Sequence, residues 1–272
     1  MTSPWKKIIA RSKAYEEVVE ACRYILYKDA VAADARAYLD SRLPRTTQAK
    51  YQFGFFPSNT DLQQLYSLGI SKSILDKLLL TYPKYAAGSK KTHCHFNNHN
   101  LIMPFRDMYG NIISLLGRTL VSDEKQKELG LQKYKYTINA KKELYVFGLN
   151  YSKEHIIKKN TVICVEGQFD HIALNEVGIY NSVAFGWANM SKYQFFNINR
   201  FTSNFILLLD NDDAGIKARK KIKAVYGDKA NIIHAYVPKE YKDIDECLRK
   251  DKDKNLIIKW ISNIPTNKER DG

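Results

Sequence analysis

Apolar residues recur at helical spacing through the first third of the chain. The spacing predicts one amphipathic helix over residues 5–28 and a second over 30–43, which Pro44 ends. The apolar face of the first helix holds Val18, Cys22, Ile25 and Leu26. Two shorter amphipathic segments follow at 61–68 and 71–80, with a glycine between them. Such a pair fits either a DNA-reading helix-turn-helix or a plain packing unit.

A hairpin pattern occupies residues 101–120. One apolar strand runs to Phe105, Tyr109 and Gly110 form a turn, and a second strand covers 112–116. Cations alternate with aromatic residues further on, at Lys133, Tyr134, Lys135, Tyr136, Lys141 and Lys142. Phosphate pairing combined with ring stacking is how proteins hold single-stranded nucleic acid without sequence choice. A solvated strand with tyrosines packed beneath it would show the same pattern.

From residue 161 onward, short apolar runs alternate regularly with helical segments. Strands are predicted near residues 161, 180, 204 and 231, and the run 205–209 is continuously apolar. Strands of this kind are buried on both faces, so they indicate a mostly parallel sheet with helices on both sides. A last helix is predicted over 251–264, followed by a polar tail at 267–272. The fold class is therefore α/β.

Acidic residues follow three of these strands. Glu166 comes after the first, Asp210 and Asp212 after the run 205–209, and Asp243 and Asp245 after a strand over 231–237. Ligands of open α/β sheets bind at the carboxyl edge. Closely packed carboxylates repel one another, and a divalent cation offsets that repulsion. The pattern predicts an oxygen-only site for Mg²⁺ or Mn²⁺.

The acidic stretch after the run 205–209 has a plainer interpretation as well. Asp213 can cap the helix that begins beside it, because aspartate is among the favoured N-cap residues. An ordinary acidic turn with a cap would need no metal. The three acidic positions together, each after a strand, favour the metal site.

The charge balance points to a polyanionic partner. The chain of 272 residues carries 43 Lys and Arg against 29 Asp and Glu, a net charge of +14. Such an excess suits nucleic acid, although it is also compatible with a simple solubility surplus. No apolar run is long enough to span a membrane, and the first residues lack the apolar core of a signal peptide. We therefore expect a soluble protein of a bacterial or infected-host cytoplasm.

The cysteines and histidines give little support for a structural metal. The four cysteines are far apart and form no C-x-x-C pair. Cys164 lies within an apolar strand and is expected to be buried. His93, Cys94, His95 and His99 are too crowded for the usual zinc spacings, so a loop at a strand end is the simpler interpretation. We expect no zinc.

The acidic motifs resemble those of the TOPRIM domain, the metal-binding unit shared by topoisomerases, DnaG-type primases and some nucleases. The matching segments are Glu166-Gly167-Gln168-Phe169-Asp170, Asp210-Asn211-Asp212-Asp213-Ala214-Gly215 and Asp243-Ile244-Asp245-Glu246. The segment Val183-Ala184-Phe185-Gly186 is similar to the strand-to-glycine segment between them.

The part before these motifs resembles the RNA-polymerase core of DnaG-type primases. The matching segments are Tyr38-Leu39-Asp40-Ser41-Arg42, Phe53-Gly54-Phe55-Phe56-Pro57, Pro104-Phe105-Arg106-Asp107, Gly110, Gly117-Arg118, Lys135-Tyr136 and Phe147-Gly148-Leu149. From this comparison we expect a core without a preceding zinc module, with a helical segment after TOPRIM reduced to about one helix, and without a following helicase-binding domain.

The resemblance implies a minimal DNA primase core from a phage or mobile element. Its expected parts are a basic, template-binding α+β subdomain over residues 1–155, a Rossmann-like TOPRIM domain over 156–250, and a C-terminal helix and tail over 251–272. The implied activity is metal-dependent nucleotidyl transfer that makes short RNA primers from ribonucleoside triphosphates on single-stranded DNA. A replicative helicase and a separate zinc-module protein are the implied partners.

The residues implied for this activity fall into two groups. Glu166, Asp210 and Asp212 would be catalytic, with Glu166 either a metal ligand or a general base. The metal ligands would be Glu166, Asp210, Asp212, Asp243 and Asp245. The nucleic-acid or nucleotide contacts would be Arg106, Arg118, Lys135, Tyr136, Lys141 and Lys142.

Two other functions use parts of the same pattern. A TOPRIM nuclease would use the same acids to cut a backbone, but it has no need of the block from Pro104 to Phe147. A non-catalytic protein that binds single-stranded nucleic acid would not need intact acidic motifs. A topoisomerase would need a second large domain that this chain length does not accommodate.

Overall fold

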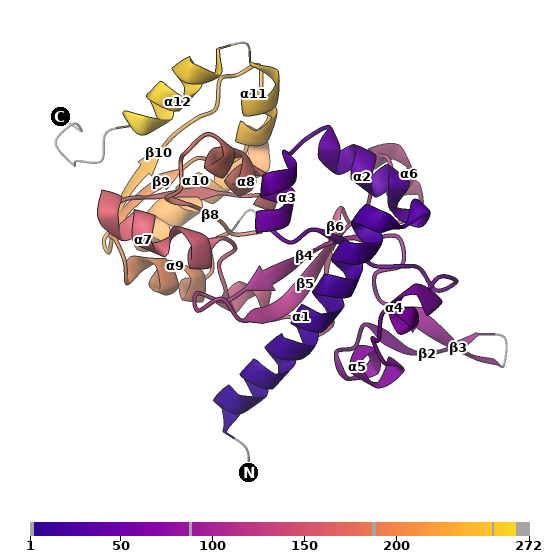
Figure 1. The fold of residues 1–272 in the computed structure, drawn as a ribbon. Helices are drawn as coiled ribbons and strands as arrows, with labels where there is room; N and C mark the ends of the chain where they lie inside the picture. The colour runs from indigo at the N-terminus through magenta and orange to yellow at the C-terminus, as the bar shows by residue number, and fades with distance from the viewer. Residues whose placement is uncertain (1–2, 87–88, 187–188, 252, 265–272) are drawn as a thin grey trace, which may run out of the picture. The chain divides into compact units, whose positions relative to one another are not determined.

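The computed structural model describes residues 3–86, 89–186, 189–251 and 253–264 (Figure 1). The chain divides into two compact units, Met1–Arg106 with Asn111–Ala140, and Asp107–Gly110 with Lys141–Gly272. The division at residue 140 precedes the expected boundary at 155. The segment between them belongs to the second unit because Val146 and Leu149 pack into its core.

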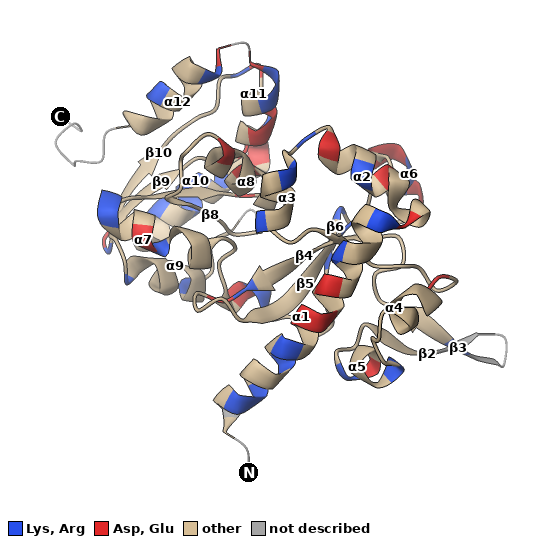
Figure 2. Ribbon diagram, in the orientation of Figure 1, with Lys and Arg blue, Asp and Glu red and all other residues tan. Residues whose placement is uncertain are grey.

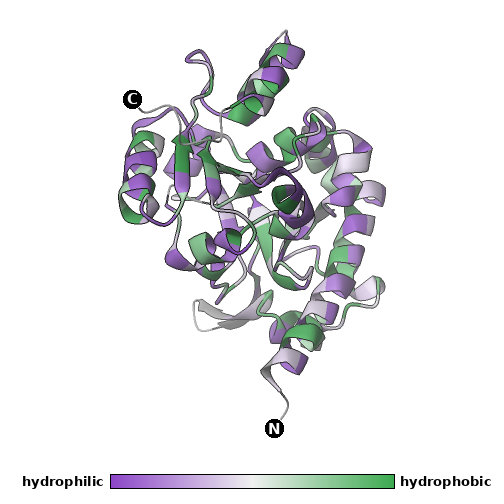
Figure 3. Cartoon of the chain, turned by 90° about the vertical axis from the view of Figure 1, so that its left-hand side faces the viewer, coloured by the Kyte–Doolittle hydropathy of each residue, from purple (hydrophilic) through white to green (hydrophobic). Residues whose placement is uncertain are grey.

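The first unit begins with a long amphipathic helix. The predicted helix is confirmed as α1 (Pro4–Lys28), and Val18, Cys22 and Leu26 on its inner face are fully buried. Hydrophobic and hydrophilic residues alternate along this helix, which starts beside the N label (Figure 3). Burial of that stripe, rather than intrinsic propensity, supplies most of the stability of such a helix.

The second predicted helix is broken into shorter pieces. A 3₁₀ turn, η1 (Ala30–Ala32), leads into α2 (Ala33–Asp40), which ends before Pro44. A further helix, α3 (Arg45–Lys50), starts directly after that proline and was not expected. Proline fixes its own φ and suits a helix start, so Pro44 ends one helix and begins the next.

Small helices and a hairpin follow. The pair α4 (Gln63–Ser67) and α5 (Lys72–Lys77) is shorter than predicted and buries Leu65 and Leu75. Helices of one to two turns fit a packing unit better than a groove-reading pair. The hairpin consists of β2 (Thr81–Ala86) and β3 (Ser89–Cys94).

The main sheet of the first unit is antiparallel, in the order β1-β4-β5-β6. The predicted hairpin is confirmed by β4 (Leu101–Arg106) and β5 (Ile112–Arg118), whose ladder pairs Leu101 with Arg118. The outer strands are β1 (Gly54–Phe55) and β6 (Tyr134–Tyr136), and α6 (Asp123–Glu128) lies between β5 and β6 in the chain.

The second unit contains the predicted parallel sheet, in the order β10-β9-β7-β8 (Figure 1). Its strands are β7 (Val162–Val165), β8 (Ser182–Ala184), β9 (Asn204–Leu207) and β10 (Asn231–His234). The α/β fold class is confirmed. The strands that precede the acidic residues, β7, β9 and β10, are neighbours in the sheet, so the acids share one edge.

Helices join these strands and cover the sheet. They are η2 (Lys142–Leu144), α7 (Leu149–Lys159), α8 (Gln168–Glu176), α9 (Lys192–Asn199), α10 (Asp213–Tyr226), α11 (Ile244–Lys250) and α12 (Lys254–Ser262). The predicted last helix is confirmed in shortened form as α12, and the expected tail at 267–272 lies outside the described residues. Among the described helices, none is long and apolar enough to cross a membrane.

The core of the second unit is aromatic and aliphatic. Phe195 stacks on Phe205 with ring centroids 5.3 Å apart, and on Tyr226 at 4.1 Å. Cys164 is fully buried among them, as predicted. β9 ends at Leu207, two residues before the apolar run does, and β10 ends at His234 rather than at Val237. The residues after each strand therefore lie beyond the regular ladder, where the acidic loops begin.

Candidate functional site

The carboxyl edge of the parallel sheet brings the acidic loops together. Glu166 follows β7, and its Oε1 accepts a hydrogen bond from the main-chain N–H of Asp210 after β9, at 3.2 Å. Asp243 and Asp245 follow β10 at the start of α11, which packs against α8. Acidic residues are visible where α8 and α11 lie side by side (Figure 2).

The pKa values of two of these carboxyl groups, Asp210 and Glu166, are raised. Burial raises the pKa of Asp210 to about 7, and the charges of Glu166, Asp243 and Asp212 add to the effect. Burial also raises the pKa of Glu166, while the N–H of Asp210 and the cations of Arg219 and Lys242 lower it. Like charges held this closely favour a bound cation.

The donor chemistry fits a hard divalent cation, because the edge offers carboxylate oxygens from three loops. In the described part of the chain, no three Asp, Glu, His or Cys side chains are already arranged to hold an ion. The metal assignment of Glu166, Asp210, Asp212, Asp243 and Asp245 therefore stays a prediction.

Two glycines allow the backbone to approach the acids. A Cβ on Gly215 would lie 2.2 Å from the Asp210 carbonyl oxygen and 3.0 Å from Glu166 Oε1. A Cβ on Gly167 would lie 2.6 Å from Asp170 Oδ2. Position 215 requires glycine because the close atom there belongs to the backbone, whereas a Cβ at position 167 would force the Asp170 carboxylate to shift.

Two of the expected ligands also cap helices. Asp212, and not Asp213 as expected, is the N-cap of α10, because its Oδ1 accepts the N–H of Gly215 at 2.9 Å. Asp243 caps α11 by accepting the N–H of Glu246 at 2.7 Å. A carboxylate that caps with one oxygen keeps lone pairs on the other, so a cap does not exclude a ligand role.

Asp170 is a site residue that sequence reasoning did not assign. It is buried on α8 and accepts the N–H of Gly167 at 3.0 Å and that of Asp245 at 3.1 Å. Burial raises its pKa well above the usual range, as do the nearby charges of Asp243 and Asp210. Asp170 is the last residue of the E-G-x-x-D motif, and that position is the sequence signal that could have identified it as a site residue.

Asp245 is less accessible than its motif suggests. It is buried at the start of α11, and its Oδ1 lies 3.2 Å from Nε of Arg249 one turn later. Its main-chain N–H is the one that Asp170 accepts. The third acidic loop is therefore joined directly to the first.

In the first unit, Arg118 is buried among tyrosines, and its guanidinium donates to the hydroxyl of Tyr134 at 2.5 Å. Its guanidinium carbon is 5.1 Å from the ring centroid of Tyr38 and 5.2 Å from that of Tyr134, its register partner on β6. The guanidinium carbon of Arg42 lies 5.3 Å from the ring centroid of the same Tyr38. The cluster combines cations with aromatic faces, the two features that hold single strands.

Lys135 and Tyr136 point to opposite faces of β6. The ammonium group of Lys135 donates to the carbonyl of His95 at 2.7 Å, and burial lowers its pKa. Tyr136 packs edge-on against Phe105, with centroids 5.7 Å apart. The tyrosine is thus partly a packing residue, and the lysine already has an internal partner.

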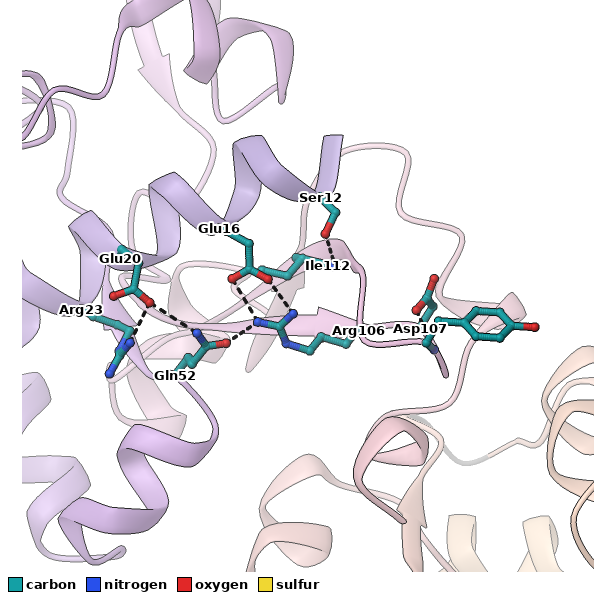
Figure 4. A network of polar contacts seen from close by, with 9 residues as sticks. Ser12, Glu16, Glu20, Arg23, Gln52, Arg106, Asp107 and Ile112 are labelled. Carbon is teal, nitrogen blue, oxygen red and sulfur yellow. Dashed lines mark hydrogen bonds and ion pairs between the residues drawn. The ribbon is translucent and has the colours of Figure 1, made fainter. Parts of the chain in front are cut away.

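Arg106 lies at the other end of the β4–β5 ladder from Arg118. Its guanidinium forms two hydrogen bonds with the carboxylate of Glu16 on α1, at 2.7 and 3.1 Å, and a third with Gln52 (Figure 4). Its side chain is only 13% exposed. The two arginines therefore do not form one patch, and Arg106 joins α1 to the sheet.

The remaining predicted contacts, Lys141 and Lys142, belong to the second unit. Lys141 is exposed at the start of η2, whereas Lys142 is half-buried, which lowers its pKa.

The crowded histidines bind backbone carbonyls. Nε2 of His95 lies 2.7 Å from the carbonyl oxygen of Tyr136, and Nε2 of His99 lies 2.7 Å from that of Gln132. A carbonyl only accepts, so each Nε2 carries the proton and donates. Both residues lie in the connection between β3 and β4, where His95 binds β6 and His99 binds the chain just before it.

Two sequence families match this arrangement. The family described as "DNA primase catalytic core, N-terminal domain" matches residues 24–153, and the family described as "Toprim-like" matches residues 163–248. The parallel sheet with its acidic edge is therefore a Toprim domain. The chain carries the N-terminal domain of a DnaG-type primase catalytic core followed by that domain, as the motifs predicted.

Individual relatives agree. A DNA primase of Aquifex aeolicus is 27% identical over 248 residues, which are 90% of this chain and 48% of that protein. A DNA primase of Clostridium acetobutylicum is 29% identical over 92% of this chain and 41% of its own length. The chain thus spans less than half the length of these relatives.

Solved structures share the fold. The zinc-binding and RNA polymerase domains of the Aquifex aeolicus primase superimpose with a TM-score of 0.76 at 25% identity, covering 93% of this chain and 60% of that one. A DnaG primase catalytic domain bound to single-stranded DNA superimposes with a TM-score of 0.71 at 21% identity, covering 93% and 80%.

Proposed function

We propose that this chain synthesises short RNA primers on single-stranded DNA by metal-dependent nucleotidyl transfer. The observation that carries the proposal is the acidic edge of the Toprim domain, where Glu166 contacts Asp210 and the charge of Asp243 raises the pKa of Asp210. The adjoining match to a primase core domain favours polymerisation over cutting. The relatives named above are DNA primases.

The residues take distinct roles in this proposal. A divalent cation, held by Glu166, Asp210, Asp212, Asp243 and Asp245, would neutralise phosphate charge and favour the attacking hydroxyl group in its ionised form. Asp170 holds the turn after β7 and the start of α11 in place through two main-chain N–H groups. Arg118, with its tyrosines, would hold template or nucleotide phosphates while the rings support bases.

The proposal extends to partners and context. A related catalytic domain has been seen with single-stranded DNA, which supports a DNA template here. Ribonucleoside triphosphates would be the second substrate. A replicative helicase and a protein with a zinc module would be partners in replicating a phage or mobile element.

The direct test is incorporation of labelled ribonucleotides on mixed single-stranded DNA, with Mg²⁺ or Mn²⁺. Asp210→Asn and Glu166→Gln should each lower incorporation by at least about 100-fold, because each removes a charge from a preorganised site. Asp228→Asn, which changes an exposed acid after α10, serves as the matched control and should leave incorporation unchanged.

A parallel reaction distinguishes the rival activity. The same preparation is incubated with end-labelled single-stranded DNA without nucleotides. Metal-dependent cutting that Asp210→Asn abolishes, with no incorporation by the unaltered chain, would identify a nuclease. Incorporation that survives in a folded Asp210→Asn protein would refute the role of the acidic edge.

A further inference from the structure

The ladder between β9 and β10 ends before the third acidic loop. Its last pair is His234 with Leu207, and one further hydrogen bond runs from the N–H of Ala235 to the carbonyl of Leu207, at 3.0 Å. Residues 236–242 lead from there to Asp243 without strand pairing. Other contacts must therefore hold this segment near Asp210.

Asn211 supplies the first of these contacts. Its side-chain Nδ2 donates to the carbonyl oxygen of Val237 at 2.9 Å and to that of Tyr241 at 3.1 Å. Its main-chain N–H also donates, to the carbonyl oxygen of Lys242 at 3.0 Å. A single residue between two acidic residues thus binds both ends of the segment that precedes Asp243.

Arg219 supplies the second contact from α10. It is only 1% exposed, and its guanidinium donates to the carbonyls of Leu209 and Asp210, the latter at 3.1 Å. The same guanidinium lies 4.5 Å from the ring centroid of Tyr236. It therefore joins the residues that follow β9 to Tyr236, the residue that starts the unpaired segment.

Both side chains donate to backbone carbonyls and leave the carboxylate oxygens alone. Asp210 and Asp243 repel each other, so these contacts, together with the hydrogen bond from the Asp245 N–H to Asp170, oppose a displacement of the loop that carries Asp243. Donors aimed at carbonyls fix the backbone without neutralising the acids. Arg219 also places a buried positive charge near Glu166 and Asp210.

We propose that Asn211 and Arg219 are positioning residues that hold the third acidic loop against the second before any ligand binds. This inference rests on the proposed function only where it concerns metal affinity. The positioning itself is a property of the chain alone. A fixed loop presents Asp243 at a set distance from Asp210, which is what a preorganised site requires.

The main test compares Asn211→Ala with Asn231→Ala in the full chain. Asn231 is the matched control, because its Nδ2 donates to Asn204 Oδ1 at 3.1 Å at the amino end of the same two strands. Amide hydrogen exchange over 236–246, measured without metal, should speed up about tenfold or more in Asn211→Ala and stay unchanged in Asn231→Ala. Mn²⁺ affinity, measured by the electron paramagnetic resonance signal of free Mn²⁺, should fall about 10–100-fold in Asn211→Ala only.

Arg219 is tested by graded substitution. Arg219→Lys keeps the charge but loses the two-pronged donor, whereas Arg219→Met loses both. Exchange over 236–246 should rise in both variants, more in Arg219→Met, with partial rescue by lysine. If Arg219→Met does not fold, Arg219→Lys and Asn211→Ala still decide the question.

Equal exchange over 236–246 in Asn211→Ala and Asn231→Ala would overturn the positioning role. Asp210→Asn separates this result from the metal assignment. If Asp210→Asn binds Mn²⁺ as well as the unaltered chain, the metal assignment fails, while the exchange data still decide the role of Asn211.

Discussion

At the scale of single residues, the acids of the Toprim edge are held mainly by backbone N–H groups. Glu166 accepts from Asp210, Asp170 from Gly167 and Asp245, and Asp212 from Gly215. Such bonds favour the charged form of a carboxylate and so offset part of the mutual repulsion. They fix one oxygen of Glu166 and one of Asp212, which orients the other oxygen, and they fix both oxygens of Asp170.

Asp212 allows its cap to be separated from its charge. Asp212→Asn keeps an oxygen that caps α10, so the free energy of unfolding should change by less than about 1 kcal/mol. Asp212→Ala loses the cap and should cost about 1 kcal/mol. Ribonucleotide incorporation should fall strongly in both variants if the charge matters. Urea unfolding and incorporation assays measure the two effects, and full incorporation by Asp212→Asn would show that Asp212 is only a cap.

At the scale of helices and strands, the predictions succeeded where apolar runs are long and failed where tertiary contacts decide. The strands before Glu166, Asp210 and Asp243 could be predicted because each is a short, mainly apolar run, and the first two runs stop directly at an acid. α3 could not, because its sequence RTTQAK has no apolar stripe.

The same limit applies to individual site residues. Asp170 acts through the N–H of Asp245, 75 residues away, which no local pattern reveals. Arg219 lies in a lysine-rich helix that reads as solvent-exposed, yet it is buried. The alternation of Lys135 with Tyr136 suggested a binding strand, whereas the register of β6 turns the lysine toward His95.

The attachment of β6 should make the first unit sensitive to acid. Burial lowers the pKa of His95 to about 4, and the charges of Lys135, His99 and His93 act in the same direction. Its unfolded pKa is about 6.5, so the stabilisation is fully present above about pH 6.5 and is lost as the pH falls toward 4. The protonation of His95 should lower the free energy of unfolding by at most about 3 kcal/mol.

His95→Gln isolates this effect, because its amide can still donate to the carbonyl of Tyr136 but does not titrate. Urea midpoints from pH 7 to pH 4 should fall more steeply for the unaltered chain than for His95→Gln. Parallel curves would show that His95 does not carry the acid sensitivity. His155→Gln, on α7 of the second unit, is the matched control and should follow the unaltered chain.

At the scale of the whole molecule, some of the basic residues could contact nucleic acid, whereas others have partners within the fold. The net charge of +14 suits a nucleic-acid partner, but not every basic residue is available for one. Arg118 is buried against tyrosine rings and donates to the hydroxyl of Tyr134, whereas Arg106 is ion-paired with Glu16. The two arginines should therefore respond differently to substitution.

Arg118→Ala should weaken single-stranded DNA binding and lower the slope of log affinity against log salt by about 0.7–1, because one phosphate contact is lost. Arg106→Ala should leave that slope unchanged and lower the free energy of unfolding by about 1–2 kcal/mol, because Glu16 and Gln52 lose their partner. Fluorescence titrations at several salt concentrations and urea unfolding measure both. A lower salt slope in Arg106→Ala would instead place that arginine on the DNA.

The cysteines and histidines of the chain are poorly suited to bind zinc. Zinc binds thiolates, but the cysteines are all buried, and burial raises the pKa of Cys94 and Cys247 to about 12. His95 and His99 use their Nε2 protons on carbonyls. Metal analysis after dialysis should therefore find less than about 0.1 zinc per chain.

With charge and stacking as its template contacts, the chain alone should start primers with little sequence preference, and a partner with a cysteine-rich domain should sharpen that preference. If the zinc-free chain alone starts primers with a sharp sequence preference, template recognition lies within this chain and no such partner is needed.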